Sequence, residues 1–230
     1  MNKNLKKNVT ISSILFSVFI IFTALLKFVD VKVWNFTQAL EHSSDFSTKV
    51  GFSSINFSLF SLFGKHKLNY MFHDLSEILG YIAVLVAAAL AFKGLTSLLK
   101  VKSFKKLNKH YYLLAAFYAV VVFFYALFEV IVINCRPVII DNALEASYPS
   151  SHTLLAVCIF VSAIYVIPHI FEIKKKYIVI ANVTLSTMAV LTVTFRMLSN
   201  VHWFTDIIGG VLLSAALISF YITFASLIKK

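Results

Sequence analysis

Residues 204–227 read FTDIIGGVLLSAALISFYITFASL, an apolar run whose one charged residue is Asp206. A helix that crosses the hydrocarbon core of a bilayer needs roughly 20 mostly apolar residues, and this run is long enough. A barrel strand would instead alternate apolar and polar residues, and the run does not alternate. The sequence therefore predicts a transmembrane helix here.

Five further stretches have the same character. They span residues 9–28, 75–97, 111–134, 152–171 and 177–195. The composition agrees, since 60% of the 230 residues are hydrophobic and only 13% are charged, whereas soluble domains are about half apolar and about a quarter charged. A soluble globular domain, a disordered chain and, with two cysteines, a disulfide scaffold are excluded. We expect one all-α integral membrane domain, residues 1–230, with six transmembrane helices.

The long segment 29–74 between the first two stretches carries a short apolar run amid serines. Its large side chains are Phe52, Ile55, Phe57, Leu59, Phe60, Leu62 and Phe63. The run is too short to span a bilayer, so we expect a helix that lies in the membrane interface or re-enters it. This helix is either a lid that packs on the bundle or a surface that meets lipid tails, and the sequence leaves both alternatives open.

The basic residues are unevenly divided between the two sides of the predicted bundle. One side holds 14 of the 21 Lys and Arg, namely Lys3, Lys6, Lys7, Lys93, Lys100, Lys102, Lys105, Lys106, Lys109, Lys174, Lys175, Lys176, Lys229 and Lys230. Cytoplasmic loops carry an excess of Lys and Arg, so we expect both termini in the cytoplasm and loops 29–74, 135–151 and 196–203 on the outer side. Topology and anionic lipid head groups account for the net charge of +11 without a nucleic-acid partner.

Polar residues gather at the outer ends of the predicted spans, and intramembrane or near-membrane polar groups usually carry function. Arg136-Pro137 ends the third span, and Glu129 lies seven residues earlier. Seven residues are about two helical turns, so we expect Glu129 on the same face as Arg136, roughly 10 Å deeper. By itself, Arg136 is better explained as a snorkelling interface residue.

The motif Pro149-Ser150-Ser151-His152 opens the fourth span. Serines in this position cap a helix, and the free backbone N–H groups and the helix dipole make such an end an anion site. The plainer interpretation is a capped helix start with an incidental histidine.

Arg196, His202 and Asp206 lie around the start of the sixth span. His202 and Asp206 are four residues apart and therefore share a helix face. A carboxylate beside an imidazole fixes its tautomer and prepares it for nucleophilic attack or proton transfer. The plainer interpretation is a structural His–Asp pair.

Taken together, the three clusters point to phosphate chemistry. Two arginines, Arg136 and Arg196, two histidines, His152 and His202, and the carboxylate of Asp206 converge on one side of the membrane. Arginine forks bind phosphate oxygens, while one histidine attacks the phosphorus and another protonates the leaving oxygen.

The order Arg-Pro, then Pro-Ser-x-His, then Arg-x5-His-x3-Asp resembles the type 2 phosphatidic acid phosphatase family. The motifs cover residues 129–210, and the six-span layout covers nearly the whole chain. The resemblance implies a bacterial membrane lipid phosphatase that needs no metal or cofactor. It implies that His202 is the nucleophile and forms a phosphohistidine, that Asp206 holds and polarises it, and that His152 is the general acid.

The resemblance also assigns the phosphate-binding residues. Arg136 and Arg196 would bind the phosphoryl oxygens, and Ser150 would complete the cradle with backbone N–H groups near Ser151 and His152. The substrate would be a lipid phosphate or diphosphate drawn from the outer leaflet, and the surrounding membrane lipids would be further partners.

The chain departs from the family pattern at three positions. Glu129 replaces the usual Lys seven residues before the Arg of the first motif, Ser151 replaces a Gly, and Phe195 replaces a Ser. The Glu is the serious change, because a phosphate-binding cation has become an acid.

Two explanations of Glu129 are open. Our hypothesis is that it pairs with Arg136 or Arg196, while Lys65 or Lys67 supplies the missing positive charge. In the alternative, the site is weakened or retuned for a different head group.

The leading prediction is a lipid phosphate phosphatase. Its candidate substrates are undecaprenyl diphosphate, phosphatidylglycerol phosphate and phosphatidic acid. The sequence is rich in Lys, Ile, Asn and Phe, which is typical of a protein from an AT-rich bacterial genome. A bacterial source slightly favours the first two substrates. The alternatives are a lipid phosphotransferase, a non-catalytic lipid-binding protein, and a metal site. The metal ligands would be His152, His202, Asp206 and Glu129, although the two flanking arginines would repel a cation.

Overall fold

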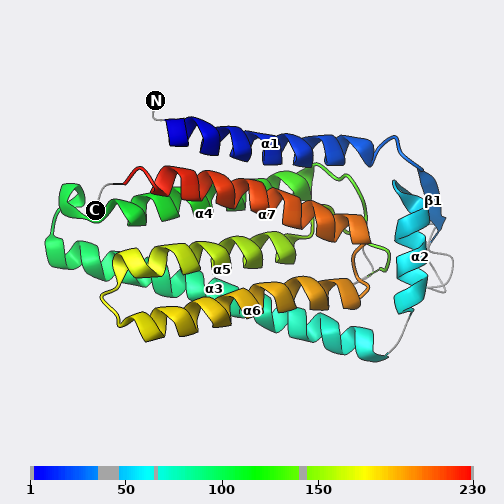
Figure 1. Cartoon of the computed structure of the whole chain (residues 1–230). Helices are drawn as coiled ribbons and strands as arrows, with labels where there is room; N and C mark the ends of the chain where they lie inside the picture. Colours follow the sequence, from blue (N-terminus) through cyan, green and yellow to red (C-terminus); the bar gives the residue numbers. More distant parts are fainter. Residues whose placement is uncertain (1–2, 36–46, 65–66, 140–143, 229–230) are drawn as a thin grey trace.

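A computed structural model describes residues 3–35, 47–64, 67–139 and 144–228 (Figure 1). Its helices are α1 (Lys3–Leu25), α2 (Ser53–Phe63), α3 (Lys67–Val101), the 3-10 turn η1 (Phe104–Lys106), α4 (Lys109–Val130), α5 (Ser151–Ile170), α6 (Lys175–Leu198) and α7 (Phe204–Ala225). Two short strands, β1 (Lys32–Asn35) and β2 (Ser47–Val50), pair antiparallel.

Six helices of the described chain are long and apolar enough to cross a membrane, so the chain is a multi-pass membrane protein as the sequence predicts. They are α1 from Asn4 onward, α3, α4, α5, α6 and α7. Of each apolar window, 50% is buried in α5 and 56% in α7, against 11–17% in the other four. The core of the bundle is therefore built on α5 and α7, and the outer helices present apolar side chains to lipid.

The ends of the helices differ from the predicted ones by up to eight residues, and two of these differences lie at the α2-containing end of the bundle. Helix α3 begins at Lys67, before the predicted residue 75. Its first two turns, KLNYMFHD, mix polar with apolar residues and therefore lack the continuous apolar run on which the predicted boundary depended. Helix α4 ends at Val130, short of the predicted residue 134. The β-branched run that follows is a weak helix former, and the side-chain amide of Asn134 donates to Asp206 Oδ1 at 3.0 Å, which fixes the chain outside the helix.

Helix α2 lies across one end of the bundle, roughly perpendicular to the spans (Figure 1). We call this end the α2 end. Asn56 of α2 donates from Nδ2 to Thr205 Oγ1 at 3.0 Å and accepts from the Thr205 N–H at 3.2 Å. Ile55 and Leu62, in contrast, are 44% and 72% exposed. The expected helix between the first two spans is therefore present. One face packs on the bundle, as the lid alternative predicts, and the other face exposes apolar side chains.

Helix α1 begins and α7 ends at the opposite end of the bundle from α2 (Figure 1). This arrangement follows from an even number of spans. It places the basic turn η1 and the loop between α5 and α6 at that same opposite end, while the segments that carry the three motifs lie at the α2 end.

Candidate active site

Backbone hydrogen bonds join the motif segments at the α2 end, although they are far apart in sequence. The Ser150 N–H donates to the Asp206 carbonyl at 2.9 Å, and the Ser147 N–H donates to the Asn134 carbonyl at 2.9 Å. The indole N–H of Trp203 donates to the Cys135 carbonyl at 2.8 Å, next to the first motif. The loop between α4 and α5 is thereby tied to the start of α7.

The start of α7 admits this loop because it carries two glycines. A Cβ atom at Gly209 would lie 2.3 Å from the ring of Tyr148, and one at Gly210 would lie 3.0 Å from the Ser150 carbonyl oxygen. The Tyr148 ring cannot move aside easily, since it is buried and its hydroxyl hydrogen-bonds to Thr23 Oγ1 at 2.7 Å. Burial also raises the pKa of Tyr148, so the hydroxyl stays neutral.

His202, the predicted nucleophile, is buried and held through Nδ1. That atom lies 3.1 Å from the Ser147 carbonyl oxygen and 3.7 Å from Asp206 Oδ2. A carbonyl only accepts, so Nδ1 carries the hydrogen and Nε2 keeps its lone pair. Nε2 is buried and has no hydrogen-bond partner among the described residues. The ring therefore presents a free lone pair, which is what a nucleophile requires.

Asp206 acts mainly on the backbone around His202. Its Oδ2 accepts from the Trp203 N–H at 3.0 Å and its Oδ1 accepts from Asn134 Nδ2 at 3.0 Å. The carboxylate thus caps α7 and anchors the loop that carries Ser147. Its contact with the imidazole is longer than a hydrogen bond, so the first acceptor of His202 is the Ser147 carbonyl.

The pKa of His202 lies well below its ordinary value. Burial is the largest cause, and the positive charges of Arg196, Arg136 and His152 follow. The hydrogen bond to the Ser147 carbonyl acts in the opposite direction and is weaker. His202 is therefore neutral at neutral pH, and all three positive groups are close enough to act on it.

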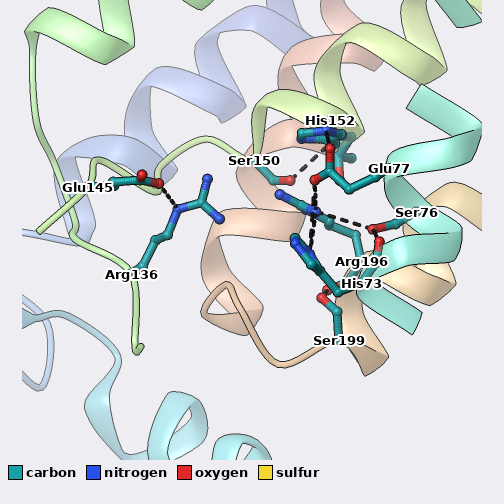
Figure 2. A network of polar contacts seen from close by, with 10 residues as sticks. His73, Ser76, Glu77, Arg136, Glu145, Ser150, His152, Arg196 and Ser199 are labelled. Carbon is teal, nitrogen blue, oxygen red and sulfur yellow. Dashed lines mark hydrogen bonds and ion pairs between the residues drawn. The ribbon is translucent and has the colours of Figure 1, made fainter. Parts of the chain in front are cut away.

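Arg196 is fully buried and bonds to α3 through one nitrogen (Figure 2). Its Nη1 lies 2.9 Å from Glu77 Oε1, 3.2 Å from Ser76 Oγ and 3.2 Å from His73 Nδ1. Its Nε and Nη2 have no hydrogen-bond partner among the described residues. A buried guanidinium with two unpaired nitrogens is costly unless an anion fills the space.

Arg136 lies on the other side of Ser150 in Figure 2, with its guanidinium turned toward that serine. Its Nε is 2.8 Å from Glu145 Oε2, and its backbone N–H donates to the Glu145 carbonyl at 3.1 Å. Ser150 itself caps α5, since its Oγ accepts from the Thr153 N–H at 3.5 Å. The two arginines and the N-terminus of α5 thus face a common space.

His152 lies on the first turn of α5 and contacts α3. Its Nε2 is 3.0 Å from Glu77 Oε2, and its Nδ1 is buried without a hydrogen-bond partner in the described chain. Ser151, the neighbouring motif residue, lines a hollow together with Ser147, His202 and Glu129.

The hypothesis that Glu129 pairs with an arginine is wrong. Glu129 is exposed on α4, and the carboxylates that bond to Arg136 and Arg196 are Glu145 and Glu77. The seven-residue spacing assumed a continuous helix, but α4 ends at Val130, and Arg136 leaves the face that Glu129 occupies.

The hypothesis on Glu129 also expects Lys65 or Lys67 to supply the positive charge that is missing at position 129. Lys67 is exposed at the start of α3, and Lys65 lies outside the described residues.

Four residues that bond to Arg196 or Arg136 are not predicted from the sequence, namely His73, Ser76, Glu77 and Glu145. A signal was available for Glu77, because an acid inside an apolar span is rare and usually functional. No such signal marks the other three. Among the residues that the structure describes, no three His, Cys, Asp or Glu side chains cluster closely enough to hold a metal ion.

Comparison with known proteins agrees with the motifs. The model of the PAP2 superfamily matches residues 12–229. The structure is similar to the crystal structure of the first transmembrane PAP2 type phosphatidylglycerolphosphate phosphatase from Bacillus subtilis, with a TM-score of 0.62 and 21% sequence identity over 95% of this chain and 98% of that one. A search of curated proteins gave no significant match. The resemblance read from the motifs is confirmed, and the chain belongs to the PAP2 superfamily.

Proposed function

We propose that the chain is a lipid phosphate phosphatase that transfers a phosphoryl group first to His202 and then to water. One observation carries the proposal: the buried Nε2 of His202 has a free lone pair beside Arg196, whose Nε and Nη2 are also free. A nucleophile beside unpaired guanidinium nitrogens is suited to a phosphoryl group and its developing charge.

The reaction has two displacement steps on the same phosphorus. In the first, the Nε2 lone pair of His202 attacks the terminal phosphorus and its bond to the leaving oxygen breaks, and His152 protonates that oxygen. The leaving oxygen belongs to the lipid alcohol when the substrate is a monophosphate and to the lipid monophosphate when it is a diphosphate. Arg136, Arg196 and the N-terminus of α5 at Ser150 hold the phosphoryl oxygens. In the second, water attacks, His152 takes its proton, and the nitrogen–phosphorus bond breaks to release inorganic phosphate.

The substrate in this proposal is a membrane lipid phosphate or diphosphate. The polar site lies at the end of the spans, beside the exposed apolar face of α2. The structurally similar Bacillus subtilis protein is a phosphatidylglycerolphosphate phosphatase. We include undecaprenyl diphosphate and phosphatidic acid as candidates, because the motifs act on the phosphate and do not distinguish between lipid tails.

The site faces outward in this proposal. The α2 end carries the fewer basic residues, while the opposite end includes η1 and the starts of α1 and α6, which are rich in lysine. Cytoplasmic ends carry the excess of Lys and Arg, so the termini are cytoplasmic.

The test is phosphate release in detergent from a panel of lipid mono- and diphosphates, with EDTA present. Wild type should release phosphate, and His202→Ala should lose at least about 1000-fold in rate, as expected for a nucleophile. His169→Ala is the matched control, since it removes a half-buried histidine from the far end of α5 and should retain the rate. No release from any lipid, or equal release by His202→Ala, would contradict the proposal.

One outcome of this test would indicate a different activity of the same site. If no inorganic phosphate is released, and the substrate lipid loses its phosphate only when an acceptor lipid is added and becomes phosphorylated, the phosphohistidine passes its group to that lipid and the chain is a phosphotransferase.

A further inference from the structure

Helix α3 contacts the ring of His152 through the side chain of Glu77 (Figure 2). Glu77 Oε2 lies 3.0 Å from His152 Nε2, and Gly80, one turn further along α3, faces the same ring. A Cβ atom at Gly80 would lie 2.9 Å from His152 Cδ2. Positions three residues apart share a helix face, so the carboxylate and the bare glycine together fix both the place and the rotation of the imidazole.

The contact with Glu77 determines which nitrogen of His152 is free. An ionised carboxylate is an acceptor only, so the proton of this bond belongs to Nε2. Nδ1 is buried and has no partner among the described residues. When the ring is protonated, the Nδ1 proton is therefore the one available for transfer.

Glu77 also connects the two predicted functions of the site. Its Oε1 accepts from Arg196 Nη1 at 2.9 Å, while its Oε2 accepts from His152. Because Nη1 is held by Glu77, Ser76 and His73, the rest of the guanidinium remains free for a phosphate. One half-buried carboxylate thus positions the proton donor and the phosphate-binding arginine relative to each other.

We propose that Glu77 is a positioning residue that holds His152 so that Nδ1 donates the proton to the leaving lipid oxygen. This inference rests on the proposed phosphatase function. In the first step the phosphorus–oxygen electron pair goes to the leaving oxygen, which takes the Nδ1 proton. In the second step the neutral Nδ1 accepts a proton from the attacking water. The Nε2–H bond to Glu77 persists throughout, and Glu77 keeps its charge.

The experiment uses leaving groups of different quality. A lipid alkoxide is a poor leaving group and needs a proton, whereas the p-nitrophenolate of p-nitrophenyl phosphate leaves without one. Glu77→Gln keeps the size and the acceptor toward Arg196, but its amide presents a donor to His152 Nε2. We expect kcat for a lipid phosphate to fall about 100-fold, the usual range for general acid catalysis, with little change in KM. The burst of p-nitrophenolate from p-nitrophenyl phosphate, whose rate reports the first step alone, should change far less, and this burst rate is the one compared because the second step uses His152 with either substrate.

Three further variants complete the test. His152→Ala should show the same selective loss, and the double variant should add little to it. Glu77→Asp, which keeps the carboxylate, should recover part of the lipid activity. Asp74→Asn removes an exposed carboxylate from the preceding turn of α3 and should leave both rates unchanged.

An equal loss on both substrates would overturn the proposal, because it would show that Glu77 only maintains the fold or the arginine. Unchanged lipid hydrolysis in Glu77→Gln would overturn it as well. If Glu77→Gln does not fold, the same ratio of rates is measured for Gly80→Ala, whose Cβ displaces the His152 ring. His202→Ala distinguishes a failure of the Glu77 proposal from a failure of the proposed phosphatase function. Activity that survives in His202→Ala contradicts the phosphatase mechanism itself, whatever the effect of Glu77→Gln.

Discussion

At the scale of single residues, the site is a set of buried polar atoms without partners. In the described chain, Arg196 Nε and Nη2, His152 Nδ1 and His202 Nε2 are all buried and unpaired. Each such group costs free energy unless it is hydrogen-bonded. Their concentration at one end of the bundle is what a site shaped for a multiply charged anion requires.

The pH dependence of the reaction tests the charge balance around His202. The positive charge of Arg136 is one of the causes that lower the pKa of His202. Removing it in Arg136→Gln raises that pKa, so protonation disables the nucleophile at a higher pH. We expect the acid limb of kcat/KM to move to higher pH in this variant, measured on the same substrate as for wild type. Lys49→Gln, an exposed cation on β2, should cause no shift, and a shift of Arg136→Gln toward lower pH would contradict the account.

Glu129 offers a second residue-scale prediction. It is exposed and lines the same hollow as His202, so we expect its negative charge to oppose a dianionic phosphate that approaches this histidine. Glu129→Lys should lower KM about fivefold with kcat unchanged, since a charge pair near the surface contributes up to about 1 kcal/mol. Glu172→Lys, at the opposite end of the bundle, is the control. An unchanged or higher KM in Glu129→Lys would show that Glu129 does not face the phosphate.

At the scale of elements, the site depends on a close fit between α7 and the loop before α5. Gly209→Ala places a Cβ against the pinned ring of Tyr148 and should destabilise the protein by about 1–3 kcal/mol while lowering activity. Thermal unfolding in detergent and phosphate release measure both effects. Gly94→Ala is the matched control, because its Cβ would meet only the ring of Tyr111, at 3.1 Å, away from the site. Full activity in Gly209→Ala would refute the fit.

The helices and motifs could be predicted from the sequence, whereas the contacts between helices could not. The six spans were predictable because length and hydropathy depend on the chain locally. The motifs with Arg136, His152, His202 and Asp206 were recognisable because their spacing is local too. The partners of the arginines were not predictable, since Glu77 meets Arg196 only when α3 packs beside α6.

For Glu129, in contrast, the sequence predicts a pairing with an arginine that the structure does not contain among its described residues. Its assumed pairing extended a helical spacing beyond the last turn of α4. The end of that helix is fixed by the tertiary bond between Asn134 and Asp206, which the sequence around Glu129 does not reveal.

At the scale of the whole molecule, one end of the bundle is dedicated to the site. Helix α2, with Phe57 and Phe60, and β1, with Trp34, pack around Trp203 at this end, with ring centroids 5.2–5.6 Å from that of Trp203. This aromatic cover lies over the loop that contains His202. The end of the bundle is thereby both polar inside and apolar outside, which suits a lipid head group whose tails remain in the bilayer.

The orientation of the whole molecule gives a further prediction. With Cys135 and Cys158 replaced by alanine, a cysteine introduced at Lys32 of β1 should react with a membrane-impermeant maleimide in intact cells. A cysteine at Lys105 of η1 should react only after permeabilisation. The reverse pattern would place the site in the cytoplasm and contradict the proposed outward face.

The proposed mechanism depends on a phosphohistidine at residue 202, and this intermediate can be trapped. Protein mixed with a substrate lipid is quenched in alkali, in which phosphohistidine survives, and the peptides are examined by mass spectrometry. We expect an acid-labile phosphate on His202 that is absent from His202→Ala. Phosphate on another residue, or substrate turnover in which no phosphorylated His202 is detected even in His152→Ala, where release should be slowed, would contradict the mechanism.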